Sequence, residues 1–458
     1  MDKRKKHIGI LQNLLITLLT VSAVLLFAQT QWYNLDLAGT YLDTLSGSTG
    51  ADTVQESFSL SAPVRVAVTG TYGRYGSVTL TTADEAFEPL GSLLKGALSS
   101  AATFSTSDFH AFFQSTEHTS VYYDFLSPLP LSVIAQLCGV ETGGDTTSVR
   151  RLVISYQEST GVSLYLWDGT EHYLRANLTL SAQELTDTVN SYDLGTAFFA
   201  GDSVDVEPLC AQVDPLSLFL YELPELPALT AANVQCDADA LLTALDFNPH
   251  TNNRYPSSDG SEVINEGSRS LRIHTNGTVV YRSGGSTALS LDVEEETLTV
   301  GEAASRTGAL LASLSSGLTG DASLYLEEAT VSGSSMTLRF GYQAGGVPIY
   351  FSDGSSAAEV TLSGATVSSL TLRLRSYTAL EDSSILLPLR QALAIAADQE
   401  GGELSIGYAD GLPRLCSDRQ AMPTAAATAS GLPGCWDKGR INFRICSQQG
   451  GAPWKAAA

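Results

Sequence analysis

The longest apolar segment of the chain lies near its start, where residues 8–28 contain no charged side chain. About 20 apolar residues in a helix span the hydrocarbon core of a bilayer. Residues 3–6 before it are all basic, and the Trp-Tyr pair at 32–33 after it is typical of the aromatic belt at a membrane interface. We therefore expect residues 1–7 to be a cytoplasmic basic end, residues 8–29 to be a transmembrane helix, and the bulk of the chain to be extracellular.

The alternative for this segment is a cleaved signal peptide. Ala28 would then lie at the cleavage position, and Leu26 would occupy the upstream site that normally holds a small residue. Signal peptides also carry a shorter apolar region, of roughly 7–15 residues. The length of the segment favours an uncleaved anchor, which makes the chain a single-pass protein of the cell membrane.

Beyond the anchor, short segments in which apolar and polar residues alternate predict many β-strands. The Asn276-Gly277 pair between two of them is one of the strongest short signals for a hairpin. Residues 131–137 fit either the start of a helix or a buried strand. The predicted strands are residues 62–70, 76–82, 151–157, 162–167, 172–180, 270–273, 278–282, 288–293, 297–300, 323–328, 336–343, 347–352, 358–362, 367–378 and 404–407.

Apolar residues at helical spacing predict helices between these strands. Ser181 and Glu184 form a capping box at the start of one helix, and Asp237 caps another. The predicted helices are residues 84–99, 108–114, 181–191, 238–247, 302–318 and 385–397. A helix followed by an antiparallel meander occurs about three times. We therefore expect an α+β fold, in which one N-terminal transmembrane helix precedes serial α+β domains of helices packed on antiparallel sheets.

Changes in composition predict the domain boundaries. Residues 201–230 contain four prolines and predict an irregular connection between an N-terminal extracytoplasmic α+β region, 39–200, and a middle α+β domain, 231–300. A C-terminal α+β domain follows at 301–411. The tail, 412–458, changes from acidic to basic, holds half of the cysteines and lacks periodicity. It is interpreted as irregular, either a disordered appendage or an out-of-frame extension, and we assign it no function.

Charge is strongly segregated along the chain. Residues 31–411 carry 15 Lys and Arg against 46 Asp and Glu, a net charge of −31. Because such a surface repels phosphate backbones, a nucleic-acid partner is excluded. It also repels anionic lipid headgroups, so the ectodomain should stand off the membrane except at its anchor. The charge fits either a well-solvated surface or a surface that binds a cationic partner.

Motifs for catalysis are weak. Ser92 and Lys95 match the S-x-x-K motif of penicillin-binding enzymes, but no K-T-G follows, and the apolar stripe of the helix already explains the two leucines between them. His110 and His118 lack the H-E-x-x-H spacing of zinc ligands, and we interpret them as ordinary surface or cap residues. We therefore expect no enzyme activity.

Motifs for metals and disulfides are equally weak. Asp259 and Glu262 suggest calcium, but the alternating ligands of an EF-hand are absent, and we interpret this segment as a turn. Three widely spaced cysteines in the acidic part do not form a disulfide scaffold, although one bridge between Cys210 and Cys236 is compatible with the sequence. We expect no cofactor and no metal.

One segment carries a more specific signal than any catalytic motif. It comprises residues 245–255 (Leu-Asp-Phe-Asn-Pro-His-Thr-Asn-Asn-Arg-Tyr), the Asp259-Gly260 pair, residues 270–273 (Ser-Leu-Arg-Ile) and residues 277–281 (Gly-Thr-Val-Val-Tyr). This order of helix end, loop, turn and two strands resembles the extracytoplasmic regulators of the YycH/YycI (WalH/WalI) type. The resemblance covers the anchor and roughly residues 235–300, and the length of the chain is closer to YycH.

The resemblance implies regulation rather than catalysis. Members of that family are single-pass proteins of Gram-positive bacteria that associate with a sensor histidine kinase of cell-wall metabolism and adjust its activity, partly through their transmembrane helices. A paralogous regulator would be a further partner. In this interpretation Leu14, Leu18, Val21 and Leu25 form a helix face toward a partner, and Ser22 is small enough to allow close approach. Lipid contact is the alternative for each of them.

The sequence therefore predicts a membrane-anchored extracytoplasmic regulator that binds a sensor histidine kinase in two-component signalling. The alternative is an acidic cell-surface binding module for a cationic or wall-derived ligand, which the net charge suggests.

Overall fold

The chain is described by a computed structural model that covers most of the predicted extracytoplasmic part. The described residues are 61–101, 103–140, 146–202, 213–251, 253–284, 288–291, 297–384, 386, 388–396, 403–410 and 441–446. The predicted cytoplasmic end and transmembrane helix lie outside them, so the anchor stays a prediction. Among the described residues, no helix is both long and apolar enough to cross a bilayer. The structure confirms the coarser prediction of a mixed α+β fold with antiparallel sheets.

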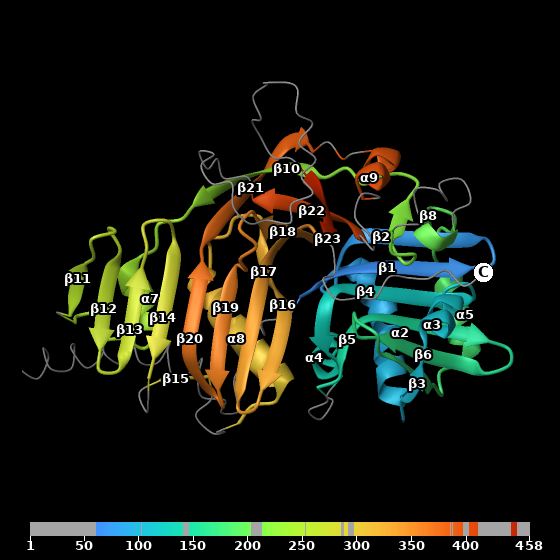
Figure 1. The fold of residues 1–458 in the computed structure, drawn as a ribbon, viewed down its shortest axis with the longest axis horizontal. Helices are drawn as coiled ribbons and strands as arrows, with labels where there is room; N and C mark the ends of the chain where they lie inside the picture. Colours follow the sequence, from blue (N-terminus) through green and yellow to red (C-terminus); the bar gives the residue numbers. More distant parts are fainter. Residues whose placement is uncertain are drawn as a thin grey trace, which may run out of the picture. The chain divides into compact units, whose positions relative to one another are not determined.

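The N-terminal part forms a nine-stranded antiparallel sheet in the order β3-β7-β6-β5-β4-β1-β2-β8-β9 (Figure 1). The predicted meander of three strands after residue 150 is confirmed as β5, β6 and β7. The strands are β1 Pro63–Gly70, β2 Gly73–Thr81, β3 Ser105–Ser107, β4 Thr119–Pro130, β5 Ser148–Gln157, β6 Gly161–Trp167, β7 Tyr173–Asn177, β8 Ala197–Phe199 and β9 Leu218–Leu220.

Short helices fill the connections of this sheet. Asp108 begins α3 by accepting a hydrogen bond from the backbone N–H of Ala111, and Ser181 begins α5 by accepting from that of Gln183. The segment 131–137 is a helix, α4. The helices are η1 Glu85–Phe87, α2 Glu88–Ser100, α3 Phe109–Ser115, α4 Leu131–Leu137, α5 Ala182–Asn190 and η2 Ala200–Asp202.

The C-terminal part forms a twelve-stranded sheet in the order β11-β12-β13-β14-β20-β19-β17-β18-β22-β23, to which β15 adds beside β20 and β16 beside β17. All pairs are antiparallel except β18 with β22. The strands are β11 Arg254–Pro256, β12 Glu262–Glu266, β13 Arg269–Ile273, β14 Thr278–Ser283, β15 Leu289–Ser290, β16 Ser323–Ser332, β17 Ser335–Ala344, β18 Val347–Phe351, β19 Ala358–Ser363, β20 Thr366–Arg373, β22 Glu403–Asp410 and β23 Ile441–Cys446.

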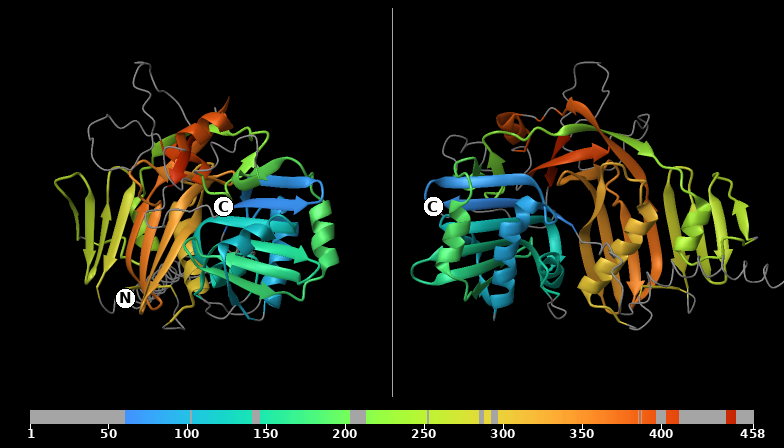
Figure 2. Two further views of the ribbon diagram at one scale, coloured as in Figure 1. Left: turned by 45° about the vertical axis from the view of Figure 1, so that its right-hand side comes forward. Right: turned by 180° about the vertical axis from the view of Figure 1, so that it is seen from behind.

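This sheet contains two meanders that meet at their last strands. Helix α7 (Ala238–Ala244) precedes β11 to β14, and helix α8 (Val300–Ser315) precedes β16 to β20, of which both β18 and β19 pair with β17. Strands β14 and β20 pair, with Tyr281 opposite Leu370. Figure 2 shows both helices on the same face of the sheet. One continuous sheet therefore crosses residue 300, while the predicted domain boundaries stay predictions.

The hairpin predicted at Asn276-Gly277 is confirmed between β13 and β14. Gly277 has φ +82°, and a Cβ atom there would lie 2.8 Å from the carbonyl oxygens of both Leu374 and Val234. Only glycine fits this position, because it combines a left-handed backbone with close approach of two other chain segments.

Two strand predictions are wrong. Residues 297–300 are not a strand, because the Thr299 hydroxyl accepts from the N–H of Glu302 while the Glu302 carboxylate accepts from the N–H of Thr299, a capping box that begins α8. Residues 367–378 are not one strand: β20 ends at Arg373, and β21 (Arg375–Ser383) pairs instead with β10 (Pro227–Asn233). Leu374 between them is fully buried and donates its N–H to the carbonyl of Gly277.

Two segments predicted to be irregular contain strands. The connection 201–230 includes β9 and the first part of β10. In the tail, β23 pairs with β22 over six residue pairs, so the interpretation of the tail as irregular is wrong for 441–446. The remaining tail residues lie outside the described part of the chain. The last helix, α9, runs from Leu389 to Ala396, within its predicted range.

Candidate functional site

A cluster of five charged side chains is buried where β22 meets the nine-stranded sheet. Arg65 belongs to β1, Asp124 to β4, Arg150 and Arg151 to β5, and Glu403 is the first residue of β22. The side chain of Arg150 is 9% exposed and that of Asp124 only 2%. We call these five residues the buried clamp, because they join strands that lie far apart in the sequence.

Glu403 is bound by guanidinium groups at both carboxylate oxygens. Nη1 of Arg65 donates to Oε1 at 3.0 Å, and Nη2 of Arg150 donates to Oε2 at 2.5 Å. Nη2 of Arg151 lies 3.3 Å from the same Oε2. Buried carboxylates are tolerated when such charge-assisted hydrogen bonds replace water.

Asp124 is the second carboxylate of the buried clamp. Its Oδ1 accepts from Nε of Arg150 at 3.2 Å and from the backbone N–H of Leu126 at 2.8 Å. Its Oδ2 accepts from Nε of Arg151 at 3.2 Å. Leu126 has φ +69°, a backbone conformation that is costly for a side chain of this size, and the hydrogen bond that its N–H donates to Asp124 helps to hold it. The register of β4 against β5 shifts at this point.

Arg151 connects the buried clamp to the ring of Trp167. Its guanidinium carbon lies 4.5 Å from the centroid of the Trp167 ring, an arrangement that favours the cation through the ring quadrupole. Its Nη2 also lies 2.6 Å from Oδ2 of Asp214, which is 21% exposed. The arginine charges are therefore matched by carboxylates and by one aromatic face.

Both carboxylates of the buried clamp are held ionised. Burial by itself would raise the pKa of Asp124, but Arg150, Arg151 and Arg65 outweigh it and hold that pKa well below its usual range. Burial by itself would likewise raise the pKa of Glu403, but the same arginines lower it. Every carboxylate oxygen of the buried clamp faces a donor. The buried clamp therefore holds strands in position and does not transfer a proton.

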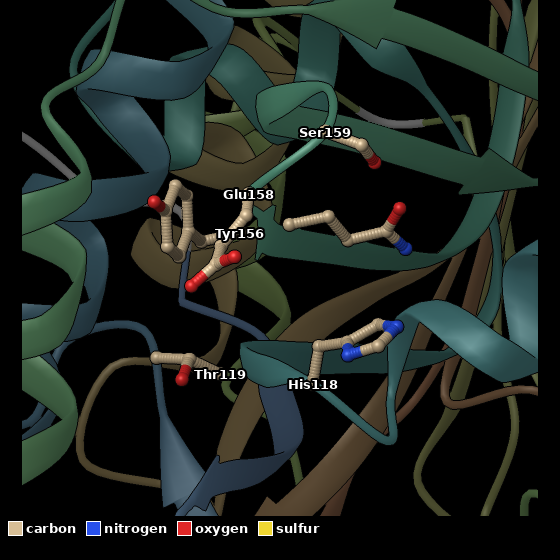
Figure 3. Close-up of a pocket in the computed structure, with 6 residues that line it drawn as sticks. His118, Thr119, Tyr156, Glu158 and Ser159 are labelled. Carbon is tan, nitrogen blue, oxygen red and sulfur yellow. The ribbon is translucent and has the colours of Figure 1, made fainter.

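An open surface hollow of about 550 Å³ lies at the other end of β4 and β5. Figure 3 shows His118 and Thr119, at the start of β4, on one side, and Glu158 and Ser159, in the turn after β5, on the other. Tyr156 also contributes to its wall. A polar, open surface of this kind can bind a solvated ligand only through a few exposed side chains.

Both histidines singled out in the sequence are exposed. His118 borders the hollow, whereas His110 lies on α3, whose start is capped by Asp108. The helix predicted over residues 108–114 is confirmed as α3. Among the described residues, no group of three His, Cys, Asp or Glu side chains is placed to hold a metal ion.

The S-x-x-K pair lies on α2. Ser92 and Lys95 are both exposed, while Leu93 and Leu94 between them are buried, as the apolar stripe predicts. Lys95 lies near Cys138, and its charge opposes the effect of burial, which raises the pKa of that thiol to about 12. Cys138 and Cys236 are free thiols, and Cys210 lies outside the described residues.

The Asp259 segment is a turn, as predicted. Oδ1 of Asp259 accepts from the N–H of Ser261 at 3.0 Å and from its hydroxyl at 2.6 Å, and Gly260 has φ +79°. Glu262 instead pairs with Arg254 at 2.8 Å. The two carboxylates therefore serve the hairpin between β11 and β12.

The segment that carries the family resemblance forms one continuous unit, from the end of α7 through β11, β12, β13 and β14. Asp246, just after the helix, has φ +58°, and its carboxylate lies 3.3 Å from Nη1 of Arg269. The guanidinium of Arg269 lies over Phe247, at 4.8 Å from the ring centroid.

Sequence reasoning did not identify the buried clamp. The available signal was the Arg150-Arg151 pair at the start of the predicted strand 151–157, since an arginine on a buried strand requires an anionic partner. The predicted partner-binding face, Leu14, Leu18, Val21, Ser22 and Leu25, lies outside the described residues.

Comparisons of the chain with protein-family models, with curated proteins and with solved structures found no match. The YycH/YycI resemblance therefore stays a prediction from the residues that carry it.

Proposed function

We propose that this protein is a membrane-anchored extracytoplasmic regulator that binds a sensor histidine kinase and adjusts its activity in two-component signalling. The proposal rests on the resemblance of residues 245–281 to regulators of the YycH/YycI type. That the quoted segments lie together in one unit, from α7 to β14, supports treating them as a single structural element.

The expected anchor explains how the protein would bind the kinase. A helix over residues 8–29 contacts a kinase helix in the bilayer through Leu14, Leu18, Val21 and Leu25, with Ser22 allowing close approach. Helix association in lipid depends on such packing, because the lipid chains are as apolar as the side chains. The folded domain outside then biases the kinase between its signalling states, which requires different contacts with each state.

The test is a crosslinking pull-down from membranes with two forms of the full chain. One form keeps its native anchor, and the other carries polyleucine in place of residues 8–28. Recovery of a histidine kinase with the native anchor alone supports recognition within the bilayer, and recovery with both forms moves the contact to the extracytoplasmic domain. Recovery with neither form contradicts the proposal.

The second candidate is a surface module for a cationic or wall-derived ligand. The net charge of −31 in residues 31–411 favours it, because only a minority of these carboxylates can be paired with the 15 basic side chains of the same region. Binding of this kind weakens steeply as salt is added. A failure to bind any wall fraction at low or high salt contradicts it.

A further inference from the structure

The face of β11 to β14 that lies opposite α7 carries three exposed side chains, Tyr255, Arg272 and Arg282. They lie beside Val280, which is half-buried, and Val263, which is buried. Successive residues of a strand point to opposite sides of a sheet. Leu271, Val279 and Tyr281 are buried in the core, so Arg272 and Val280 point to the other side. Among the helices of the described residues, none covers this side in Figure 1 or Figure 2.

The strand register places these side chains in one row. Tyr255 of β11 lies opposite Val263 of β12, which lies opposite Arg272 of β13, which lies opposite Val280 of β14. Arg282 is two residues beyond Val280 on the same strand, and so on the same face. We call these five residues the open-face row.

Two arginines of the open-face row are exposed and free of ion pairs. Arg282 has no hydrogen-bond or ion-pair partner among the residues that the structure covers, and Arg272 has no such partner either, although it lies in the field of Asp259. By contrast, Arg339 on the same sheet face is held by Glu328 at 2.8 Å and Glu359 at 3.2 Å. The surrounding region has a net charge of −31, so two neighbouring arginines without a carboxylate partner are a local departure from its acidic character.

The apolar members of the row set the class of ligand. Tyr255 is 46% exposed, one of the few large apolar side chains in the described residues with that exposure, and its hydroxyl accepts from Nδ2 of Asn265 at 2.6 Å. Tyrosine and arginine are enriched at the energetic centres of protein interfaces. A phosphate polymer or a lipid headgroup would bind the arginines alone and would leave the exposed ring of Tyr255 without a contact.

We infer that the open-face row is a docking surface for an acidic segment of a protein partner, with Arg272 and Arg282 binding two carboxylates and Tyr255 and Val280 contacting an apolar side chain. The two arginines lie diagonally across a strand pair, roughly 7–8 Å apart at the backbone. Carboxylates on alternate residues of an extended segment are spaced by about 6.6 Å, which fits this separation.

This inference rests on the proposed function for the identity of the partner, but not for the chemistry of the surface. The test replaces Val280 by a photo-crosslinking amino acid in the full chain, in membranes, with Tyr72 in the turn between β1 and β2 as the control position. The variant pair R272E and R282E is compared with K95E and R390E, two exposed positions on α2 and α9, so that both variants change the net charge equally.

The inference predicts a protein adduct from position 280 that position 72 does not give. R272E with R282E should lower the affinity for that protein about tenfold or more, whereas K95E with R390E should leave it unchanged. Replacing the carboxylates of the crosslinked segment by arginine should restore binding to the doubly reversed variant.

Adducts to lipid or wall polymer alone, or equal binding by both double variants, would overturn the inference. The two proposals fail separately. A kinase that copurifies equally with R272E/R282E removes the docking surface and leaves the regulator, whereas a charge-dependent adduct to another protein leaves the docking surface and removes the kinase.

Discussion

Nη2 of Arg150 lies 2.5 Å from Oε2 of Glu403, although 253 residues separate them in the chain. This contact and the one from Arg65 fasten β22 to the nine-stranded sheet through buried charges. A buried ion pair contributes little when compared with a well-packed apolar pair, but removing one partner leaves an uncompensated charge.

We therefore expect Glu403→Gln to lower the free energy of unfolding by about 3–5 kcal/mol, because three guanidinium groups would lose a carboxylate. Chemical denaturation followed by circular dichroism measures it. The matched control is Glu359→Gln, whose exposed pair with Arg339 should cost less than about 1 kcal/mol. Equal effects of the two substitutions would show that the buried clamp does not stabilise the fold.

The buried clamp also predicts how stability depends on pH. The folded-state pKa values of Asp124 and Glu403 lie below their unfolded values, which are about 3.9 and 4.3. Below those values the unfolded chain binds more protons, so the stabilisation is complete above about pH 5 and is lost as the pH falls further. Urea titrations between pH 3 and pH 7 measure it. The Glu403→Gln variant should lose less stability over this range than the native chain, and an identical slope would count against the assignment.

Gly277 allows a matched test of backbone geometry. Gly277→Ala should destabilise the protein by more than about 2 kcal/mol, because the new Cβ meets two carbonyl oxygens at 2.8 Å in addition to the cost of a positive φ. Gly267→Ala, at φ +60° with nothing within 4 Å, isolates the backbone cost of about 1 kcal/mol. Thermal denaturation of both variants gives the difference, and equal losses would mean that the segments around Leu374 and Val234 move aside.

Cys138 should react slowly with alkylating reagents. Burial raises the pKa of its thiol to about 12, so the reactive thiolate is scarce near neutral pH. Iodoacetamide labelling resolved by peptide mass spectrometry measures the rate at this position. Labelling in denaturant is the control and should be far faster, and a fast rate in the folded protein would contradict the burial of this thiol.

Local signals predicted much of the fold. The Asn276-Gly277 hairpin, the Asp237 cap and the helix at 84–99 follow from residues close in the sequence, and the structure has all three. Where two local signals competed, the apolar alternation at 297–300 was misleading, because the capping pair of Thr299 and Glu302 already begins a helix there.

The sequence pattern does not predict which distant strands pair with each other. Nothing near Leu374 indicates that the chain changes sheets there, because the partner strand of β21 lies about 150 residues earlier. The acidic partners of Arg150 and Arg151 are likewise distant, so a sequence pattern shows two buried charges without showing what neutralises them.

The pairing of β14 with β20 joins two units of similar design through their last strands, which run in opposite directions. In the first unit α7 is followed by four strands, and in the second α8 is followed by five. That is the geometry of an isologous contact in a symmetric dimer, here closed within a single chain. The β14–β20 pair therefore resembles a local two-fold axis within one chain. Each half gives the edge strand of the other half a partner strand, which protects that edge from aggregation. A chain cut between α7–β14 and α8–β20 should therefore reassociate as a non-covalent pair of halves.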